Sequence, residues 1–447
     1  MPQTFVFNKS IIGASHIRSG KPCQDFSMSY QNDDVKILVV CDGHGGSTYF
    51  RSDVGSKIAA EVCIKHLVEF AQGTPVDFFM NESYALPAKP QRNPFVDADG
   101  NRVRYEDLDE SQQQYAKQAQ AYVEAEGRCI EQQAFINKLL TEIYSEWRSC
   151  IVQDEHENPF SSKEISILNG NGIEKAYGCT LLAYMQTPHY WLSFHIGDGK
   201  IYICDENLTW KMPVPEDCAC FLNYTTSLCD NNPVDEFRFA FNGTRKRPLA
   251  VVLCSDGLDG SLRNQENIID FYEQIIGLHI DGDDINDELT SYLPRLSELG
   301  NKDDISLAGL MYLPDASLAK IKKLLELKKE SRELHTEYRT RKQEIDTLLS
   351  KLEALRLRYE RHKDTRFMQL TELDEMRQVI RGKETAIEAL DKTISDIRAE
   401  INEVESLLKA KETSFEDWRF TTKNRRAEIE ESQNELTGTR KEESNQN

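Results

Sequence analysis

The sequence predicts an α/β domain followed by a long α-helical coiled coil. Short apolar runs rich in β-branched residues alternate with segments of helical periodicity in the first part, which indicates layers of strands and helices. Hydrophobic residues recur with a seven-residue period from Leu324 onward, which indicates a coiled coil. We therefore expect the α/β domain over 1–315, the coiled coil over 316–437 and a disordered tail over 438–447.

The net charge of −21 is unevenly distributed along the 447 residues. From Ala316 onward 28 basic residues balance 28 acidic ones, so the whole excess of negative charge lies in the α/β domain. An acidic domain is a poor partner for nucleic acid or for an anionic membrane, but it is compatible with divalent cations. We expect neither nucleic acid nor a membrane as a partner.

The 11 cysteines include no CxxC pair, and several of them lie in apolar runs. Such residues are typical of the reduced core of a cytosolic protein. The N-terminus lacks the pattern of a signal peptide, and no run approaches the roughly 20 apolar residues of a membrane helix. The sequence therefore predicts a cytoplasmic protein.

The strands and helices of the α/β domain are predicted from hydrophobic periodicity and from the turn residues that bound each segment. We expect helices at 52–71 and 135–152, each with one apolar face, and strands at 4–7, 15–26, 35–41, 179–184, 190–196, 200–204, 247–254 and 305–313. Residues 74–130 are polar and contain several prolines, so we interpret them as an insertion or an elaborated helical region. Residues 205–245 are expected to be loop-like.

Carboxylates recur at the ends of the predicted strands. The pairs Asp42-Gly43, Asp198-Gly199 and Asp256-Gly257 each follow an apolar run, and Asp25 and Asp303-Asp304 each adjoin one. Any one pair is explained by a simple turn, but gathered carboxylates cannot stay ionised together without cations. Hard oxygen ligands select Mg²⁺ or Mn²⁺, and two such ions about 3.5–4 Å apart make a site for phosphoester hydrolysis.

Several short motifs occur in a fixed order along the chain: Gln24-Asp25, Val40-Cys41-Asp42-Gly43-His44-Gly45-Gly46, Gly178-Cys179-Thr180, Gly197-Asp198-Gly199, Ser255-Asp256-Gly257 and Asp303-Asp304-Ile305-Ser306. This ordered set resembles the metal-dependent protein phosphatase family, the type-2C serine/threonine phosphatases, and most of all its bacterial branch. The resemblance spans about 1–313. It implies a four-layer α-β-β-α sandwich with two metal ions at one end of the sheets.

The resemblance also implies a role for each matched residue. Asp42 would bridge both metal ions, and the Gly43 carbonyl would contact one of them. Asp256 and Asp303 would hold the first ion, with Asp25 near the second through a water. His44 would protonate the leaving oxygen of serine or threonine, while a water activated by the metals attacks phosphorus in line.

Three positions depart from the family pattern. Gln24 stands where the family usually has an acid, and Gly20 stands where it has an arginine that grips the phosphate. Lys21 or Arg18 is a candidate substitute, although lysine cannot form the bidentate fork of arginine. Asp198 matches the acid of a third metal site, but the acid expected four residues after Asp256 is Gly260, with Asp259 one place early.

Taken together, these motifs predict a Mg²⁺- or Mn²⁺-dependent serine/threonine protein phosphatase that acts on phosphoproteins made by a cognate kinase. The alternative is a pseudophosphatase that keeps the fold and works as a binding or scaffolding module through its coiled coil. A third reading is a phosphatase of small molecules. The absent arginine favours the pseudophosphatase, whereas the retained carboxylates and His44 oppose it.

The coiled coil has one register along its length. With Ile345 at position a, the a and d positions are mostly apolar as far as Leu436, and the seam turns polar at His362, Arg366 and Gln369. An apolar seam of this length needs a partner helix. We expect a parallel homodimer, since Ile dominates position a from Ile380 to Ile401. The competing model folds the chain back at 362–369 into an antiparallel hairpin.

Overall fold

The computed structural model describes residues 4–90, 93–96, 102–214, 225–375 and 380–437. The chain forms two compact units, 1–322 and 323–447. The predicted tail, 438–447, lies outside the described residues.

The first unit is built on two antiparallel sheets. The five-stranded sheet has the order β1-β11-β10-β7-β8, and the six-stranded sheet has the order β2-β3-β5-β6-β9-β4. The strands are β1 (Thr4–Ile11), β2 (Phe26–Gln31), β3 (Lys36–Cys41), β4 (Ser83–Leu86), β5 (Leu181–Gln186), β6 (Trp191–Ile196), β7 (Lys200–Cys204), β8 (Trp210–Lys211), β9 (Arg238–Asn242), β10 (Ala250–Cys254) and β11 (Ile305–Tyr312).

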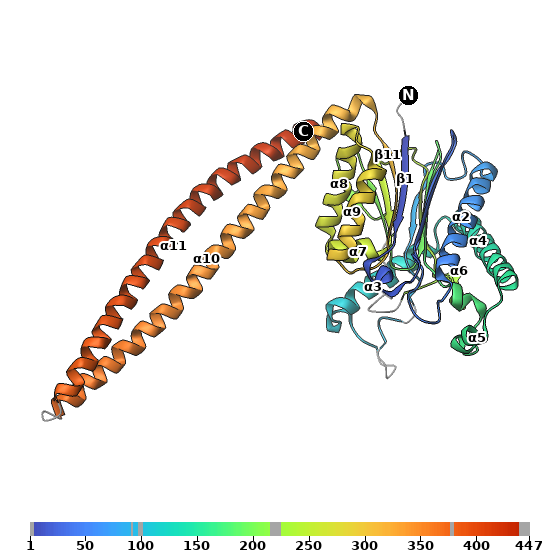
Figure 1. Ribbon diagram of the computed structural model, residues 1–447. Helices are drawn as coiled ribbons and strands as arrows, with labels where there is room; N and C mark the ends of the chain where they lie inside the picture. The colour runs from blue at the N-terminus through green and yellow to red at the C-terminus, as the bar shows by residue number, and fades with distance from the viewer. Residues whose placement is uncertain (1–3, 91–92, 97–101, 215–224, 376–379, 438–447) are drawn as a thin grey trace. The chain divides into compact units, whose positions relative to one another are not determined.

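Helices cover the outer faces of both sheets, which gives four layers (Figure 1). Helices α2 and α4 lie on the six-stranded sheet, and α7, α8 and α9 lie on the five-stranded sheet. The helices of this unit are α1 (Ala14–Ser19), α2 (Ser52–Gly73), α3 (Glu110–Glu126), α4 (Ile130–Glu157), α5 (Ser162–Leu168), α6 (Pro233–Glu236), α7 (Asp256–Leu262), α8 (Gln265–Asp281) and α9 (Ile285–Leu299), with 3-10 turns at Tyr105–Asp107 and Ile173–Tyr177. The predicted α-β-β-α sandwich is confirmed.

Strand β3 shows why the sequence produces two cores. Successive side chains of a strand point to opposite faces, so the apolar run from Ile37 to Cys41 must be covered on both sides. Ile37 and Val39 pack into the core beneath α2 and α4, whereas Leu38 and Val40 pack into the core between the sheets. All four side chains have 0% exposure, which fixes the strand that leads into Asp42.

Three predicted segments differ from the structure. Residues Ala14–Ser19 form a helix where a strand over 15–26 was predicted, although Asp25 does directly precede β2. Residues 205–245 contain strand β9, which the prediction of a loop missed. The 74–130 region contributes β4 at the edge of the six-stranded sheet, beside β9, as well as helix α3.

The second unit is formed by α10 (Asp315–Glu375) and α11 (Ile380–Thr437), which pack against each other as an antiparallel pair (Figure 1). Three ion pairs show that the helices run in opposite directions, because later residues of α10 pair with earlier residues of α11. The pairs are Glu330–Arg425, Glu344–Lys411 and Arg356–Glu405. Predicted a and d residues fill the seam, among them Ile345, Leu352, Leu355 and Val404.

The competing hairpin model placed the fold-back at 362–369, whereas α10 is helical through these residues and ends at Glu375. The antiparallel pair buries within one chain the same seam that led us to expect a parallel homodimer. A heptad pattern requires a partner helix but does not say which chain supplies it. Self-association of the chain stays a prediction.

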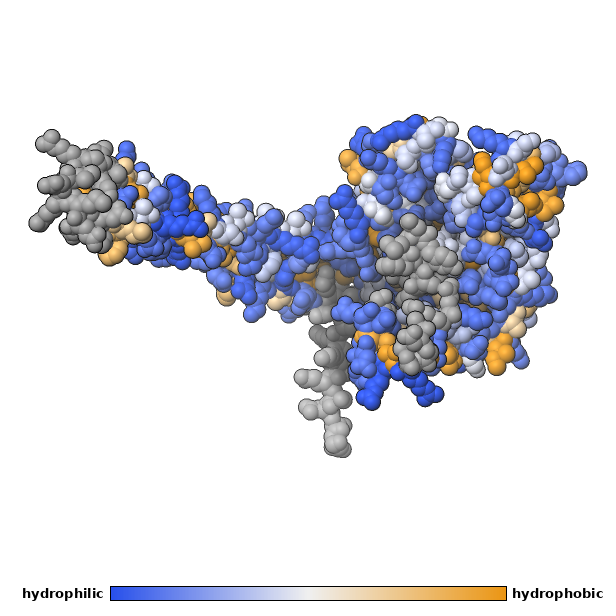
Figure 2. Space-filling model, turned by 90° about the horizontal axis from the view of Figure 1, so that it is seen from below, coloured by the Kyte–Doolittle hydropathy of each residue, from blue (hydrophilic) through white to orange (hydrophobic). Residues whose placement is uncertain are grey.

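Three further features of the structure concern the cysteines, the helices and the surface. All cysteines among the described residues are free thiols. Within the same residues no helix combines the length and the apolar character that crossing a membrane requires. The face shown in Figure 2 is largely hydrophilic, with hydrophobic residues scattered over it.

Candidate active site

Two carboxylates lie at one edge of the six-stranded sheet. Strands β2 and β3 are antiparallel, with Phe26 opposite Cys41, so the residue before β2 and the residue after β3 are neighbours. These residues are Asp25 and Asp42. Thr180 anchors the second of them, since its amide donates to the Asp42 carbonyl at 2.8 Å and its hydroxyl accepts from the Asp42 amide at 3.0 Å.

The five-stranded sheet contributes three more carboxylates at the ends of its strands. Asp256 follows β10, and Asp303 and Asp304 precede the neighbouring β11. The Ser255 amide donates to the Ser306 carbonyl at 2.9 Å, which extends the pairing of the two strands to this point. The two sheets therefore present acidic residues at strand ends that the sequence separates widely.

Electrostatic coupling shows that these carboxylates form one cluster. The Asp42 and Asp256 carboxyl groups lie close enough to shift each other's pKa. Burial raises the pKa of Asp42 well above its usual range, and the charges of Asp25 and Asp256 raise it further. Burial and then the charge of Asp198 raise the pKa of Asp256 to about 6. The carboxylates of the cluster thus repel one another.

The Asp25 carboxylate interacts with several other acids of the cluster. Burial raises its pKa well above the usual range, a hydrogen bond from Ser255 acts in the opposite direction, and Asp304 and Asp256 raise it again. Its Oδ2 is buried and has no hydrogen-bond partner among the residues that the structure describes. A buried carboxylate oxygen without a donor, beside other carboxylates, fits a divalent cation such as Mg²⁺ or Mn²⁺.

His44 lies two residues beyond Asp42, and its main chain is held from several sides. Its amide donates to the Gly178 carbonyl at 3.1 Å, and its carbonyl accepts from the Ser52 hydroxyl at 2.9 Å. The imidazole meets the ring of Tyr49 edge-on, with centroids 4.7 Å apart. Burial lowers the pKa of His44 to about 4, and the charge of Asp198 acts in the opposite direction.

Gln24, which replaces the expected acid, connects three parts of the site. Its side-chain amide donates to the His44 carbonyl at 3.1 Å and to the Ser52 hydroxyl at 2.6 Å. Its backbone amide donates to Asp304 Oδ2 at 2.6 Å. An acid at this position could not donate these two side-chain bonds, so the amide nitrogen of Gln24 suits its neighbours, whereas its Oε1 is buried without a partner among the described residues.

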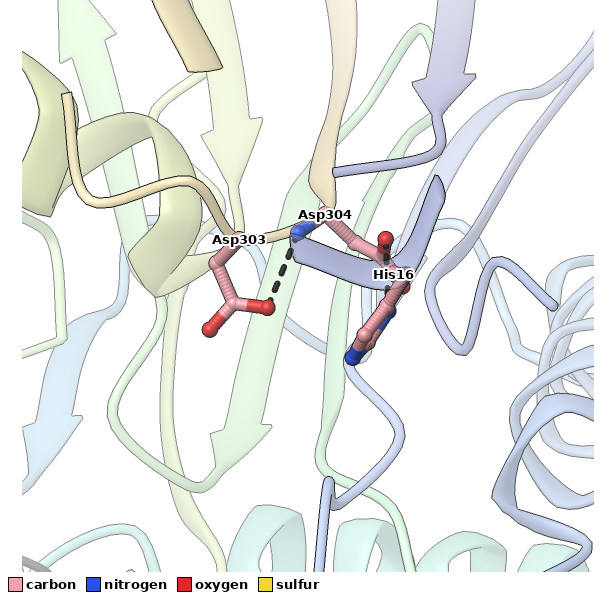
Figure 3. Close-up of side chains that lie close together, drawn as sticks. All are labelled: His16, Asp303 and Asp304. Carbon is pink, nitrogen blue, oxygen red and sulfur yellow. Dashed lines mark hydrogen bonds and ion pairs between the residues drawn. The ribbon is translucent and has the colours of Figure 1, made fainter. Parts of the chain in front are cut away.

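Asp304, His16 and Asp303 form a further group whose ligand atoms lie within 4.8 Å of one another, a spacing that a metal ion could use (Figure 3). Asp304 Oδ1 accepts from the Gly13 amide at 2.6 Å and from His16 Nδ1 at 2.9 Å, and Oδ2 accepts from Gln24. Since donors already surround Asp304, we assign it to holding the loops together. The Asp303 carboxylate is exposed and accepts only the Asp304 amide among the bonds described for it.

The two candidates for binding phosphate differ in position. Lys21 Nζ donates to the Gly45 carbonyl at 3.0 Å, which places the ammonium group beside the Asp42–Gly46 turn. Arg18 is paired with Glu298 on α9, at the exposed surface. The structure thus brings Lys21 to the turn and leaves Arg18 engaged elsewhere.

Asp198 and Asp259, the acids considered for a third metal site, both have partners. The Thr225 hydroxyl donates to Asp198 Oδ2. Lys200 Nζ lies 2.8 Å from Asp259 Oδ2. The acid expected at position 260 is absent, and the acid one place earlier, Asp259, is already paired with Lys200.

Sequence reasoning missed two residues next to His44. Tyr49 contacts the imidazole, and Lys175 lies over the Tyr49 ring at 5.0 Å from its centroid. Neither has a sequence signal of its own, because Lys175 precedes the Gly178–Thr180 motif by three residues and comes close to His44 only in the folded chain. The role of Gln24 was equally invisible, since its partners are distant in sequence.

Solved structures with a similar fold include bacterial serine/threonine phosphatases. The S. agalactiae serine/threonine phosphatase is 14% identical with a TM-score of 0.37, over 70% of this chain and 100% of that chain. The Mycobacterium tuberculosis serine/threonine phosphatase PstP/Ppp is 13% identical with a TM-score of 0.36, over 70% and 99%. A C. elegans sex determining protein is 13% identical with a TM-score of 0.40, over 72% and 67%.

A search of curated proteins finds no match. The assignment therefore rests on the family model described as protein phosphatase 2C, which matches residues 12–294. That match covers more than half of the chain and includes Asp25, Asp42, His44 and Asp256, although it ends before Asp303. The predicted family is confirmed: the chain belongs to the protein phosphatase 2C family.

Proposed function

We propose that the protein hydrolyses phosphoserine and phosphothreonine in proteins, with two Mg²⁺ or Mn²⁺ ions as cofactors. The observation that carries the proposal is the cluster formed by the buried Asp25 and the partly exposed Asp42 and Asp256, which lie together although their charges repel. A fold does not retain such a cluster without a compensating role, and cation binding is the role that suits carboxylate oxygens.

Asp42 is the residue best suited to serve both cations, because it interacts with Asp25 from its own sheet and with Asp256 from the other. Asp25, Asp256 and Asp303 would supply the remaining carboxylates, and Gly43 a carbonyl. When bound, the cations lower the pKa of a shared water and offset the charge of the phosphoryl group. The protein's part is to fix the oxygens that hold them.

His44 is the proposed proton donor to the leaving oxygen of serine or threonine. Its backbone is fixed by Gly178 and Ser52, and its ring by Tyr49. A serine alkoxide is a poor leaving group, so a proton delivered at this point is typically worth about 10²–10⁴-fold in rate. Burial opposes the charged imidazole, whereas Asp198 favours it.

Lys21 is the proposed contact for the substrate phosphate. It is the candidate that lies beside the Asp42–Gly46 turn, whereas Arg18 pairs with Glu298. A lysine offers a single point charge where the family usually has an arginine fork. This weaker grip is the feature that favours the pseudophosphatase as a second candidate function.

The deciding experiment is release of phosphate from a panel of phosphoserine and phosphothreonine peptides by the full chain, with Mn²⁺ or Mg²⁺ and with EDTA. We expect metal-dependent release that Asp42→Asn abolishes, with the exposed Asp283→Asn as a matched control. No release from the peptides with a folded protein that still binds Mn²⁺ would favour the pseudophosphatase. Release from small phosphate esters alone would favour the third reading.

The partners predicted from the sequence belong to the same proposal. A phosphatase of this class needs a kinase that makes its substrate, and the paired helices α10 and α11 offer a surface for other proteins or for a second copy of the chain. The cytoplasmic location is supported by the free cysteines.

A further inference from the structure

Lys200 occupies a position next to the carboxylate cluster. It is the first residue of β7 and lies opposite Cys254, two residues before Asp256. Its ammonium group forms an ion pair with Asp259 at 2.8 Å. The side chains of Lys200 and Asp259 are 20% and 29% exposed, so this pair is mostly shielded from water.

Asp198 and Asp259 both lie close enough to Asp256 for their charges to raise its pKa. These are the two acids that would have to hold a third cation. Asp198 Oδ2 already accepts the Thr225 hydroxyl, and Asp259 is paired with Lys200. Both acids are therefore engaged by side chains of the protein itself.

The position that would complete a third site is also blocked. A Cβ on Gly260 would come within 2.6 Å of Asn301 Nδ2, so any side chain there needs Asn301 to move. Asn301 is held in turn, because its Oδ1 accepts from the Ser261 hydroxyl at 2.9 Å. Position 260 thus provides no acid, and Asn301 occupies the space that a side chain there would need.

We infer that the ammonium group of Lys200 takes the place of a third cation, so that the protein binds two divalent ions and not three. A lysine ammonium is a compact charge with three donors, which suits an acidic site that lacks the ligands for a metal. A divalent ion at Asp259 would have to break the ion pair and then tolerate the displaced ammonium group nearby. The inference rests on the proposed two-cation site.

The test is the number of Mn²⁺ ions bound by the full chain, measured by calorimetry and by the loss of the free Mn²⁺ signal in electron paramagnetic resonance. We expect two ions for the wild type. Lys200→Met should gain a third, weaker ion, because Asp259 loses its cation. Lys200→Arg should keep two, and Lys211→Met, on the exposed side of β8, is the matched control.

A double variant, Lys200→Met with Asp259→Asn, should return to two ions, and circular dichroism checks that each variant is folded. Three ions in the wild type, or two ions in folded Lys200→Met, would overturn the inference alone. Fewer than two ions in the wild type would overturn the two-cation site and the inference together.

Discussion

The carboxyl groups of Asp42 and Asp256 lie close enough to shift each other's pKa, although one follows β3 of the six-stranded sheet and the other follows β10 of the five-stranded sheet. The two acids therefore lie at the same end of the sandwich. Carboxylates this close together, in a site largely shielded from water, are stabilised in their charged form by a nearby cation. The relationship therefore joins the packing of the sheets to the binding of metal.

Asp42→Asn and Asp256→Asn should each abolish phosphate release. Each removes a charged oxygen from the cluster, so the loss should exceed the about 10–100-fold cost that is typical of residues one shell further out. The same variants should raise the melting temperature of the protein in EDTA, because they relieve the repulsion between buried acids. They should also lose most of the stabilisation that Mn²⁺ gives the wild type.

Phosphopeptide kinetics and thermal melts with and without Mn²⁺ check both effects. Asp283→Asn, an exposed change, should leave both unchanged. Full activity of either cluster variant, or full activity of the wild type after complete chelation, would contradict the role of the cluster.

His44→Ala should slow phosphoserine peptides by about 10²–10⁴-fold and should affect an aryl phosphate much less. The phenolate leaving group of the aryl ester needs no proton, so only the serine ester depends on an acid. Steady-state rates on the two substrates measure the difference. Equal losses on both would assign His44 a structural role.

Gln24→Glu should destabilise the protein by about 1–3 kcal/mol, even though it restores the acid that the family usually has. The carboxylate cannot donate to the His44 carbonyl and the Ser52 hydroxyl, and it adds a charge among acids. Urea unfolding in EDTA measures the loss. Gln265→Glu at the exposed start of α8 is the control and should be neutral or slightly stabilising. An unchanged midpoint for Gln24→Glu would show that the two donated bonds contribute little.

His195 should make the stability of the protein depend on pH. Burial lowers its pKa well below the usual range, and the neighbouring Arg238 lowers it further. The unfolded chain therefore binds a proton near pH 6.5 that the folded chain does not. The stability that neutral His195 provides is complete above pH 6.5 and falls as the pH drops toward the folded pKa.

Removing this proton by His195→Gln should flatten the loss of stability between pH 6.5 and 5 by up to about 1.4 kcal/mol per pH unit. Urea unfolding of the two proteins at several pH values provides the comparison. His156→Gln, on the last turn of α4, is the control and should leave the slope unchanged. Parallel slopes for the wild type and His195→Gln would mean that His195 protonates in the folded protein as well.

The sequence predicted those parts of the fold that local pattern determines. Strand β3 is apolar from Ile37 to Cys41 and is followed by Asp42-Gly43, so both its burial and the carboxylate were visible. Strand β9 was missed because Arg238 and Asn242 are polar and the strand lies in a segment without a clear period, although its neighbours bury Phe239 and Phe241 completely. Tertiary contact, rather than propensity, makes this segment a strand.

The candidate site shows the same division. Acids at strand ends could be predicted to converge, because antiparallel neighbours bring the start of one strand beside the end of the next. The partners of Gln24 and the pairing of Lys200 with Asp259 could not, since each joins segments whose spacing is set by the packed sheets. The direction of α10 against α11 was also open, because an a/d seam is equally apolar for either direction.

The last prediction concerns the pairing of α10 with α11. Tyr338 on α10 stacks on Trp418 and contacts Phe415 on α11, with ring centroids 5.7 Å and 5.5 Å apart. If Tyr338 is replaced by the photoreactive p-benzoylphenylalanine, irradiation should cross-link it to the segment around Phe415 and Trp418 of the same chain. The product should keep the mass of a monomer.

The same group in place of Leu357, which is 58% exposed, should give little cross-linking to α11 and serves as the control. In a parallel homodimer the group would instead meet the same stretch of the second chain, and the product would have twice the mass. Gel mobility, light scattering and mass spectrometry of the cross-linked peptide distinguish the two arrangements. A doubled mass with a cross-link near residue 338 of the second chain would rule out the intrachain pair and support the parallel homodimer.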